Sequence, residues 1–242
     1  MIKTNHKCYK IFLLIALILV NNASFANDFD RALDAVNKGD YETARKLWQP
    51  LADQGNSLAE YNIGYMNYHG HGGAKNYKEA IKWYTVSALH GNNVARYTLG
   101  VIYESGNVIE KDYKLAEAWY QLAAEEGYGK AQFNLGMLYL DDKGEITNYQ
   151  EGLRLIRLAA ENGQSKAQFN LGIFYKEGKF LTKNDFLAYI WFTIASEDKA
   201  IINANAEKKL VAKNLSGKQL VDAKKVVVGC IQHAFKDCNI SK

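Results

Sequence analysis

The sequence has little proline and cysteine and only one long apolar run. It contains one proline and three cysteines in 242 residues. Because proline interrupts helices, its near absence, together with an alanine-rich composition, favours an all-α chain. The apolar run is residues 11–20, and no second stretch of membrane-spanning length follows it. The rest of the chain is therefore expected to be soluble, with no membrane insertion after removal of a leader.

Residues 1–26 have the features of a signal peptide. Three lysines precede the apolar run, and small residues stand at positions 24 and 26 behind it. A run of ten residues is too short to cross a bilayer. Cys8 lies before the run, whereas a lipoprotein would need a cysteine just after it. We predict cleavage after Ala26 and a periplasmic or secreted mature protein; the alternative is an uncleaved membrane anchor.

The mature chain lacks a strong charge of either sign. Loss of the three leader lysines lowers the formal net charge from +4 to +1. The remaining lysines and arginines are scattered among aspartates and glutamates and form no basic stripe of the kind that phosphate binding requires. Nucleic acid is therefore not an expected partner.

Several columns of residues recur every 36 positions, which identifies a repeat array. Small residues and glycines dominate these columns. The columns are Ala59, Ala95, Ala131 and Ala167; Gly64, Gly100, Gly136 and Gly172; Gly55, Gly91, Gly127 and Gly163; and Ala44, Ala80, Ala116, Gly152 and Ala188. Apolar residues between them follow helical spacing, so each repeat is predicted to be a helix hairpin.

The columns also place the helices. First helices are predicted at 57–69, 93–105, 129–141 and 165–177, and second helices at 77–90, 113–126, 149–162 and 185–196. Pro50 is expected to kink or end the second helix of the opening hairpin. The periodicity stops after residue 196, and two further amphipathic helices are expected at 204–212 and 217–230 as a terminal cap.

Four glycines at one position inside the first helices require a compensating contact, because each costs about 1 kcal/mol relative to alanine. We expect the second helix to approach closely there, with large side chains filling the adjoining core. The expected core side chains are Trp83, Trp119, Leu155 and Trp191, together with the aromatic column Tyr61, Tyr97, Phe133 and Phe169.

The repeated order of a small residue, an aromatic residue, Leu-Gly and Tyr, followed by a helix with Ala and Trp, resembles the Sel-one-like repeat (SLR) family. The resemblance covers roughly residues 41–197. It implies an α/α solenoid, a right-handed superhelix of hairpins similar to tetratricopeptide repeats. The expected organisation is a leader at 1–26, a shortened opening hairpin at 27–56, four hairpins at 57–197 and a helical cap at 198–242.

No catalytic constellation is visible in the sequence. A serine elbow, a cysteine placed for pairing with a histidine, and a spaced serine–lysine pair are all missing. We therefore expect no enzyme and no cofactor. The alternative is an enzyme related to cell-wall or β-lactam chemistry, since some cysteine-rich relatives of the SLR family are linked to β-lactam binding or hydrolysis. The repeats of this chain contain no cysteine.

His69 and His71 form the one close histidine pair, in a glycine-rich loop. They could supply two metal ligands, but no cysteine or acidic cluster is tied to them by spacing, so a solvated loop is favoured over a metal site.

Cys230 and Cys238 remain after leader removal, and an even pair in an exported chain suggests a disulfide. Eight residues of continuous helix span about 12 Å, too far for this bond, so the helix must end between them. Unpaired thiols and an intermolecular bridge are the alternatives.

Stacked hairpins form an extended concave face lined by their first helices, and such a face is suited to a protein or peptide. The candidate binding residues are carried over from the resemblance. They differ from repeat to repeat, as expected of a surface adapted to one ligand. Unselected sequence drift at the surface would give the same variation. The candidates are Tyr65, Val101, Met137 and Ile173, then Tyr68, Glu104, Leu140 and Lys176. The sequence predicts a protein-binding scaffold, periplasmic or secreted, with a host-directed role among the options and its partner unknown.

Overall fold

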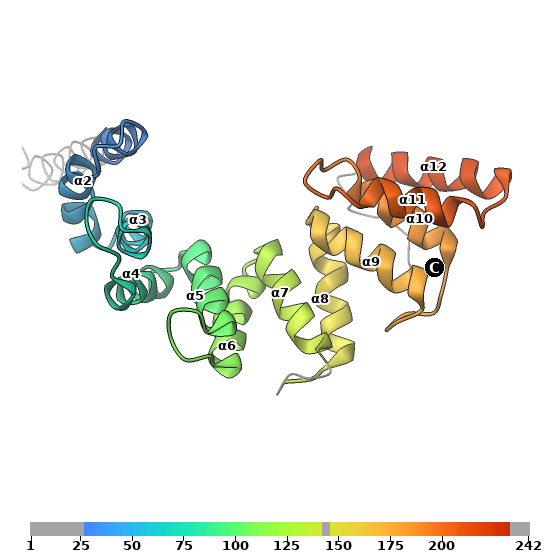
Figure 1. The fold of residues 1–242 in the computed structure, drawn as a ribbon, viewed down its shortest axis with the longest axis horizontal. Coiled ribbons are helices and arrows are strands. Elements are labelled where there is room, and N and C mark those ends of the chain that lie inside the picture. The colour runs from blue at the N-terminus through green and yellow to red at the C-terminus, as the bar shows by residue number, and fades with distance from the viewer. Residues whose placement is uncertain (1–26, 142–145, 233–242) are drawn as a thin grey trace, which may run out of the picture. The chain divides into compact units, whose positions relative to one another are not determined.

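The computed structural model describes residues 27–141 and 146–232, and every regular element in these ranges is a helix (Figure 1). Residues 27–37 are helical and precede α2. The further helices are α2 (Tyr41–Asp53), α3 (Ser57–His69), α4 (Tyr77–Leu89), α5 (Asn93–Ser105), α6 (Tyr113–Glu125), α7 (Gly129–Leu140), α8 (Tyr149–Glu161), α9 (Ser165–Glu177), α10 (Asp185–Ala195), α11 (Ala204–Ala212) and α12 (Gly217–Gln232). The predicted all-α class and the helix-hairpin repeat are confirmed.

The eight helices predicted for the four hairpins all begin at the predicted residue and end within one residue of the predicted end. The second helices start where they do because an asparagine or aspartate caps each of them. Its side-chain oxygen accepts a hydrogen bond from the backbone N–H three residues later, which satisfies a helix-end donor. The capping residues again recur every 36 positions, as Asp40, Asn76, Asp112, Asn148 and Asn184.

Pro50, which was expected to kink or end its helix, does not end it; the kink stays a prediction. It lies inside α2, which continues to Asp53. Proline removes one backbone donor, but Pro50 is exposed to solvent, where water can satisfy the carbonyl left without a helical partner. The helix therefore tolerates the proline.

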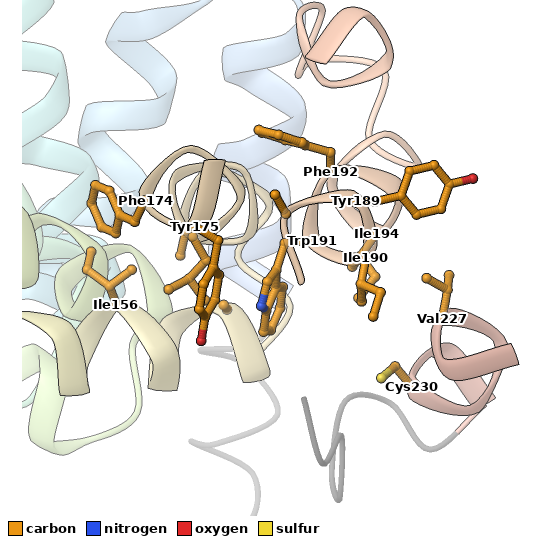
Figure 2. Close-up of a cluster of buried hydrophobic side chains, with 14 of the residues drawn as sticks. Ile156, Phe174, Tyr175, Tyr189, Ile190, Trp191, Phe192, Ile194, Val227 and Cys230 are labelled. Carbon is orange, nitrogen blue, oxygen red and sulfur yellow. The ribbon is translucent and has the colours of Figure 1, made fainter. Parts of the chain in front are cut away.

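The chain divides into two compact units, residues 1–99 and 100–242. In the first unit, Trp48, Ile63 and Met66 centre a core that joins helical residues 27–37 to α2 and α3. In the second unit, the largest core surrounds α10. Phe192 and Ile190 of that helix are almost completely buried, and α12 adds Val227 and Cys230 beside it (Figure 2).

The glycine column of the first helices is where the two helices of each hairpin touch. A Cβ atom added at Gly136 would lie 2.9 Å from Cδ1 of Ile156 and 3.0 Å from the carbonyl oxygen of Gly152. The same atom at Gly172 would lie 2.6 Å from the ring of Phe192. The expected close approach at the small-residue column is therefore present, and it leaves no room for a side chain.

The side chain that covers the glycine is one residue further along than the expected core column, in which Leu155 and Trp191 are buried as predicted. Trp83 and Trp119 are only partly buried, whereas Tyr84 and Tyr120 are 1% and 0% exposed and face Gly64 and Gly100. One residue turns a helix by about 100°, so this shift selects a different face. The buried column is Trp48, Tyr84, Tyr120, Ile156 and Phe192, also spaced by 36.

A column of polar side chains, buried except at Arg96, links neighbouring hairpins. Gln132 and Gln168 each donate a hydrogen bond from Nε2 to the backbone carbonyl eight residues earlier, at 3.1 and 3.0 Å. Arg96 does the same from Nε to the carbonyl of Ala88, at 3.0 Å. In addition, Oε1 of Gln132 accepts a hydrogen bond from Asn162, 30 residues later. Each such side chain ties the start of one first helix to the end of the preceding second helix.

Glu60 occupies this column in the first full hairpin but uses different chemistry. Its carboxylate is buried and accepts a hydrogen bond from Nδ1 of His90, with distances of 2.8 and 2.9 Å to the two oxygens. His90 again lies 30 residues later, so the pair replaces the Gln132–Asn162 contact. A carboxylate cannot donate to the carbonyl of Ala52, the counterpart of Ala124. The Glu60–His90 hydrogen bond thus stands at a position where a glutamine side chain could satisfy both its donor and its acceptor.

The C-terminal helices α11 and α12 both pack on α10. Cys230 is 4% exposed within this packing. Cys238 lies outside the described residues, so the disulfide between the two cysteines stays a prediction. The predicted leader, residues 1–26, also lies outside them. Within the described ranges, no helix is both long enough and apolar enough to cross a membrane.

We predict that Gly136→Leu lowers the free energy of unfolding by about 3 kcal/mol, because the new side chain would overlap Ile156 and the Gly152 backbone. Urea denaturation followed by circular dichroism measures this change. Gly229→Ala is the matched control, since Gly229 lies inside α12 with nothing within 4 Å of a new Cβ. It should raise stability by about 0.5–1 kcal/mol. Unchanged stability of the Gly136 variant would contradict the packing contact.

We predict that Glu60→Gln leaves stability unchanged or raises it, because glutamine can donate to Ala52 and still accept from His90 without burying a charge. His90→Ala in the parent chain should cost about 1–3 kcal/mol, since it leaves the carboxylate of Glu60 buried with no partner. The same substitution in the Glu60→Gln background should cost less. Denaturation of the four proteins of this cycle tests the assignment, and equal costs of His90→Ala in both backgrounds would refute it.

Candidate binding surfaces

The candidate binding residues fall into separate groups. Tyr65 and Tyr68 lie in the first unit, and Glu104, Met137 and Leu140 line one groove in the second. The remaining candidates of the second unit are only partly exposed. They are Val101, Ile173 and Lys176.

In the first unit, tyrosine and histidine rings gather at the end of α3. The ring of Tyr65, 41% exposed, lies 4.1 Å from that of His69 and 5.7 Å from that of His71. His71 also stacks on Tyr41 of α2, with ring centroids 4.4 Å apart. Tyr68 packs edge-on against Tyr77 at 5.1 Å. We call Tyr41, Tyr65, His69 and His71 the aromatic patch.

The two histidines of the patch are held by ring stacking. Their centroids are 5.8 Å apart. Burial by the surrounding rings lowers the pKa of His69, and the nearby positive charges of His71 and Lys75 lower it further. Among the described residues, no group of three or more His, Cys, Asp or Glu side chains is arranged to hold a metal ion. The patch presents aromatic and imidazole rings at the end of α3.

In the second unit, a groove of 580 Å³ lies at the C-terminal ends of the first helices. We call it the α7–α9 groove. Its apolar surface comes mainly from α7 and α9, and charged side chains stand around it. The lining residues are Glu104, Tyr113, Met137, Leu138, Leu140, Asp141, Phe174, Glu177, Lys179 and Phe180. A volume of this size is typical of sites that accept a ligand or a few side chains.

Leu140 was expected to point outward, and this is wrong. It is 3% exposed and belongs to the core cluster of the second unit. The reason is the glycine at position 152 of α8: a Cβ atom there would lie 2.9 Å from Cδ2 of Leu140. Leu140 thus fills the space that an alanine occupies in the other repeats, and it forms the inner wall of the groove.

Ile173 and Lys176 of α9 lie near the C-terminal cap. The ammonium of Lys176 is 2.8 Å from the carboxylate of Glu207 on α11, and both side chains are mostly buried. Ile173 packs against the core cluster. In the last hairpin, the cap therefore covers part of the face that the sequence assigns to a ligand.

Phe180 is a groove residue that sequence reasoning missed. It stands in the loop between α9 and α10, in a column that holds Gly72 and Val108 in other repeats. Its φ is 64°, a left-handed backbone conformation that is rare for a bulky side chain. The ring is held between Phe174, at 5.2 Å and edge-on, and Tyr149, at 5.7 Å. An aromatic residue in a loop column otherwise free of them was the available signal.

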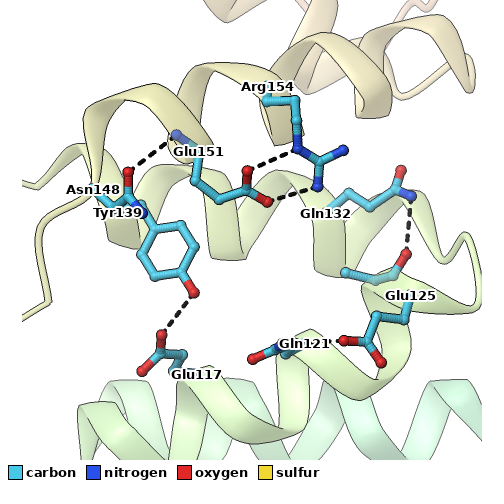
Figure 3. Close-up of polar contacts among 9 residues, drawn as sticks. Glu117, Gln121, Glu125, Gln132, Tyr139, Asn148, Glu151 and Arg154 are labelled. Atoms are coloured by element: carbon cyan, nitrogen blue, oxygen red, sulfur yellow. Dashed lines mark hydrogen bonds and ion pairs between the residues drawn. The ribbon is translucent and has the colours of Figure 1, made fainter.

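A second groove, of 420 Å³, lies between α6 and α8 over α7, and its polar groups bond to one another (Figure 3). Tyr139 donates to Glu117 at 2.6 Å, and burial and this carboxylate raise the pKa of Tyr139, which keeps the hydroxyl protonated. Arg154 binds both oxygens of Glu151, at 2.6 and 2.8 Å. Since a ligand here would have to displace internal hydrogen bonds, the α7–α9 groove is the better candidate.

A family model described as "Sel1 repeat" matches five segments of the chain, at residues 32–56, 57–92, 94–128, 129–164 and 165–199. Among solved structures, a Sel1 repeat protein from Oxalobacter formigenes is 27% identical, with a TM-score of 0.65, over 79% of this chain and 86% of that one. The comparison with curated proteins finds no match.

A second similar structure is c5321, a protective antigen present in uropathogenic Escherichia coli strains and displaying an SLR fold. It is 28% identical, with a TM-score of 0.50, over 90% of this chain. The alignment spans 56% of the Escherichia coli protein. The likeness therefore concerns the repeat array and not the whole of that protein.

Proposed function

Because the chain belongs to the Sel1 repeat family, whose members are helical scaffolds for protein interactions, we propose that it binds a protein or peptide on its first helices. The proposal rests on the contrast between the two faces of these helices. Positions that pack, such as Ala131 and Gly136, recur unchanged and are buried. Positions on the opposite face differ between repeats, and Met137 and Glu104 meet there in a groove.

Both candidate surfaces suit a polypeptide ligand. The aromatic patch presents tyrosine and imidazole rings, which supply large contact area at low cost in side-chain entropy. The α7–α9 groove combines an apolar floor with charged groups at its edge, the usual arrangement of a binding site for a side chain and its flanking backbone. No catalytic arrangement is needed for this role.

We further propose that the protein acts outside the cytoplasm. The features of residues 1–26 support this, as does the likeness to a protein described as a protective antigen. A host-directed partner is compatible with such a location. The ligand is in that case another exported protein or a host protein.

We expect a photo-crosslinking amino acid at Tyr65 or Met137, introduced in the native organism, to capture a discrete ligand that mass spectrometry identifies. Lys82 and Gln150, exposed on second helices of the first and second unit, are the matched control positions. They should capture little or nothing, because the ligand contacts the first helices. Equal capture from all four positions would refute a binding face there.

Export predicts that the protein purified from its native organism begins at Asn27, as read by N-terminal sequencing. Cleavage after Ala26 leaves this residue first. An Ala26→Leu variant should be processed poorly, since the peptidase site needs small residues, whereas Asn22→Gln should be processed normally. A protein that retains Met1 and stays in the cytoplasmic fraction would exclude export.

A further inference from the structure

The α7–α9 groove has a preformed apolar wall. Phe180 has a left-handed backbone conformation, and its ring packs against those of Phe174 and Tyr149. Met137, which is partly exposed, adds apolar surface to the same groove. A ring fixed before binding costs a ligand no additional ordering of that side chain. The groove is therefore ready to receive an apolar side chain.

Acidic side chains outnumber basic ones among the described residues that line the groove. Glu104, Asp141 and Glu177 are acidic and Lys179 is basic, while Lys111 lies beside the lining residue Tyr113. The carboxylate of Glu104 is fixed by the hydroxyl of Tyr120, which donates to it at 2.5 Å and itself accepts from Nδ2 of Asn134 at 2.9 Å. An acceptor held in this way keeps free lone pairs for a cationic donor.

The face of Phe180 also accepts positive charge. The ammonium of Lys179 lies 4.7 Å from the centre of this ring, a cation–π distance. A cation brought by a ligand would replace this ammonium at the ring, in a groove that is also lined by carboxylates. Phosphate-bearing ligands, in contrast, would be repelled by the acidic edge.

We propose that the α7–α9 groove binds a peptide segment in which an arginine or lysine adjoins an apolar side chain. The apolar side chain packs against Met137 and Phe180, and the cation pairs with Glu104 and Glu177. This rests on the proposed function, because it assigns the chemistry of the ligand to part of the first-helix surface. Arginine suits the site better than lysine, since its planar group can bind two carboxylate oxygens and stack on a ring.

Fluorescence polarisation of the full chain with three labelled octapeptides tests the proposal. The first alternates arginine and leucine, the second has glutamate in place of arginine, and the third has serine in place of leucine. The first should bind about tenfold more tightly than either of the others, and its affinity should fall as salt screens the carboxylates. Equal affinity for the arginine and glutamate peptides would overturn the proposal.

Two variants and one control locate the binding. Glu177→Lys should weaken the arginine–leucine peptide about fivefold, and Phe180→Gly by a similar factor while relieving the left-handed backbone. Glu161→Lys makes the same charge change at an exposed position of α8 outside the groove and should leave the affinity unchanged. Equal loss from Glu177→Lys and Glu161→Lys would mean non-specific attraction and would refute the groove.

Failure of this proposal on peptide chemistry can be distinguished from failure of the proposed scaffold role. If Met137 crosslinks a ligand whose capture is unchanged in Glu177→Lys, the peptide chemistry proposed here is wrong and the binding face stands. If neither Tyr65 nor Met137 crosslinks anything above the Lys82 and Gln150 controls, the scaffold role itself fails.

Discussion

The contact that the hairpins depend on is the one between a helical glycine and the large side chain that covers it. Wherever the first helix carries this glycine, the second helix lies close enough for Tyr84, Tyr120, Ile156 or Phe192 to touch its backbone. Glycine weakens a helix by about 1 kcal/mol, and burying an aromatic or aliphatic side chain contributes about 1.5–3 kcal/mol. The packing gain therefore offsets the helical cost, and the spacing between the two helices is set in each hairpin.

Once hairpins are fixed internally, polar side chains join them to their neighbours. Gln132 and Gln168 do this with backbone carbonyls near the end of a helix, each of which also accepts a hydrogen bond from the backbone N–H three residues later. Glu60 and His90 make the corresponding link with a hydrogen bond between the buried carboxylate and the exposed imidazole. Such links have directional geometry, so they set how one hairpin lies on the next, whereas apolar contacts alone would permit sliding. Surface residues outside these columns do not take part in this packing, so they can differ from one repeat to the next.

The α7–α9 groove arises where the pattern is varied. Gly152 has no side chain, and Leu140 packs into the space that this leaves. Phe180 places an aromatic ring at a loop position where two other repeats have Gly72 and Val108. Both changes lie in the fourth and fifth repeats of the family match. A repeat protein can thus build a site from small departures while its core columns stay constant, which is consistent with a scaffold whose ligand is chosen by the variable positions.

Sequence alone determined the α-helical class, the 36-residue hairpin and nearly every helix boundary, because these depend on local features: helical spacing, capping residues and turn glycines. It also located the glycine contact. Only the tertiary structure decided which of two adjacent aromatic residues meets the glycine, since one step along a helix turns the side chain by about 100°. The burial of Leu140, the pairing of Lys176 with Glu207 and the position of Phe180 likewise depend on neighbours far along the chain. Whether one residue fills the space left by another depends on packing between distant parts of the chain, which a local sequence pattern does not show.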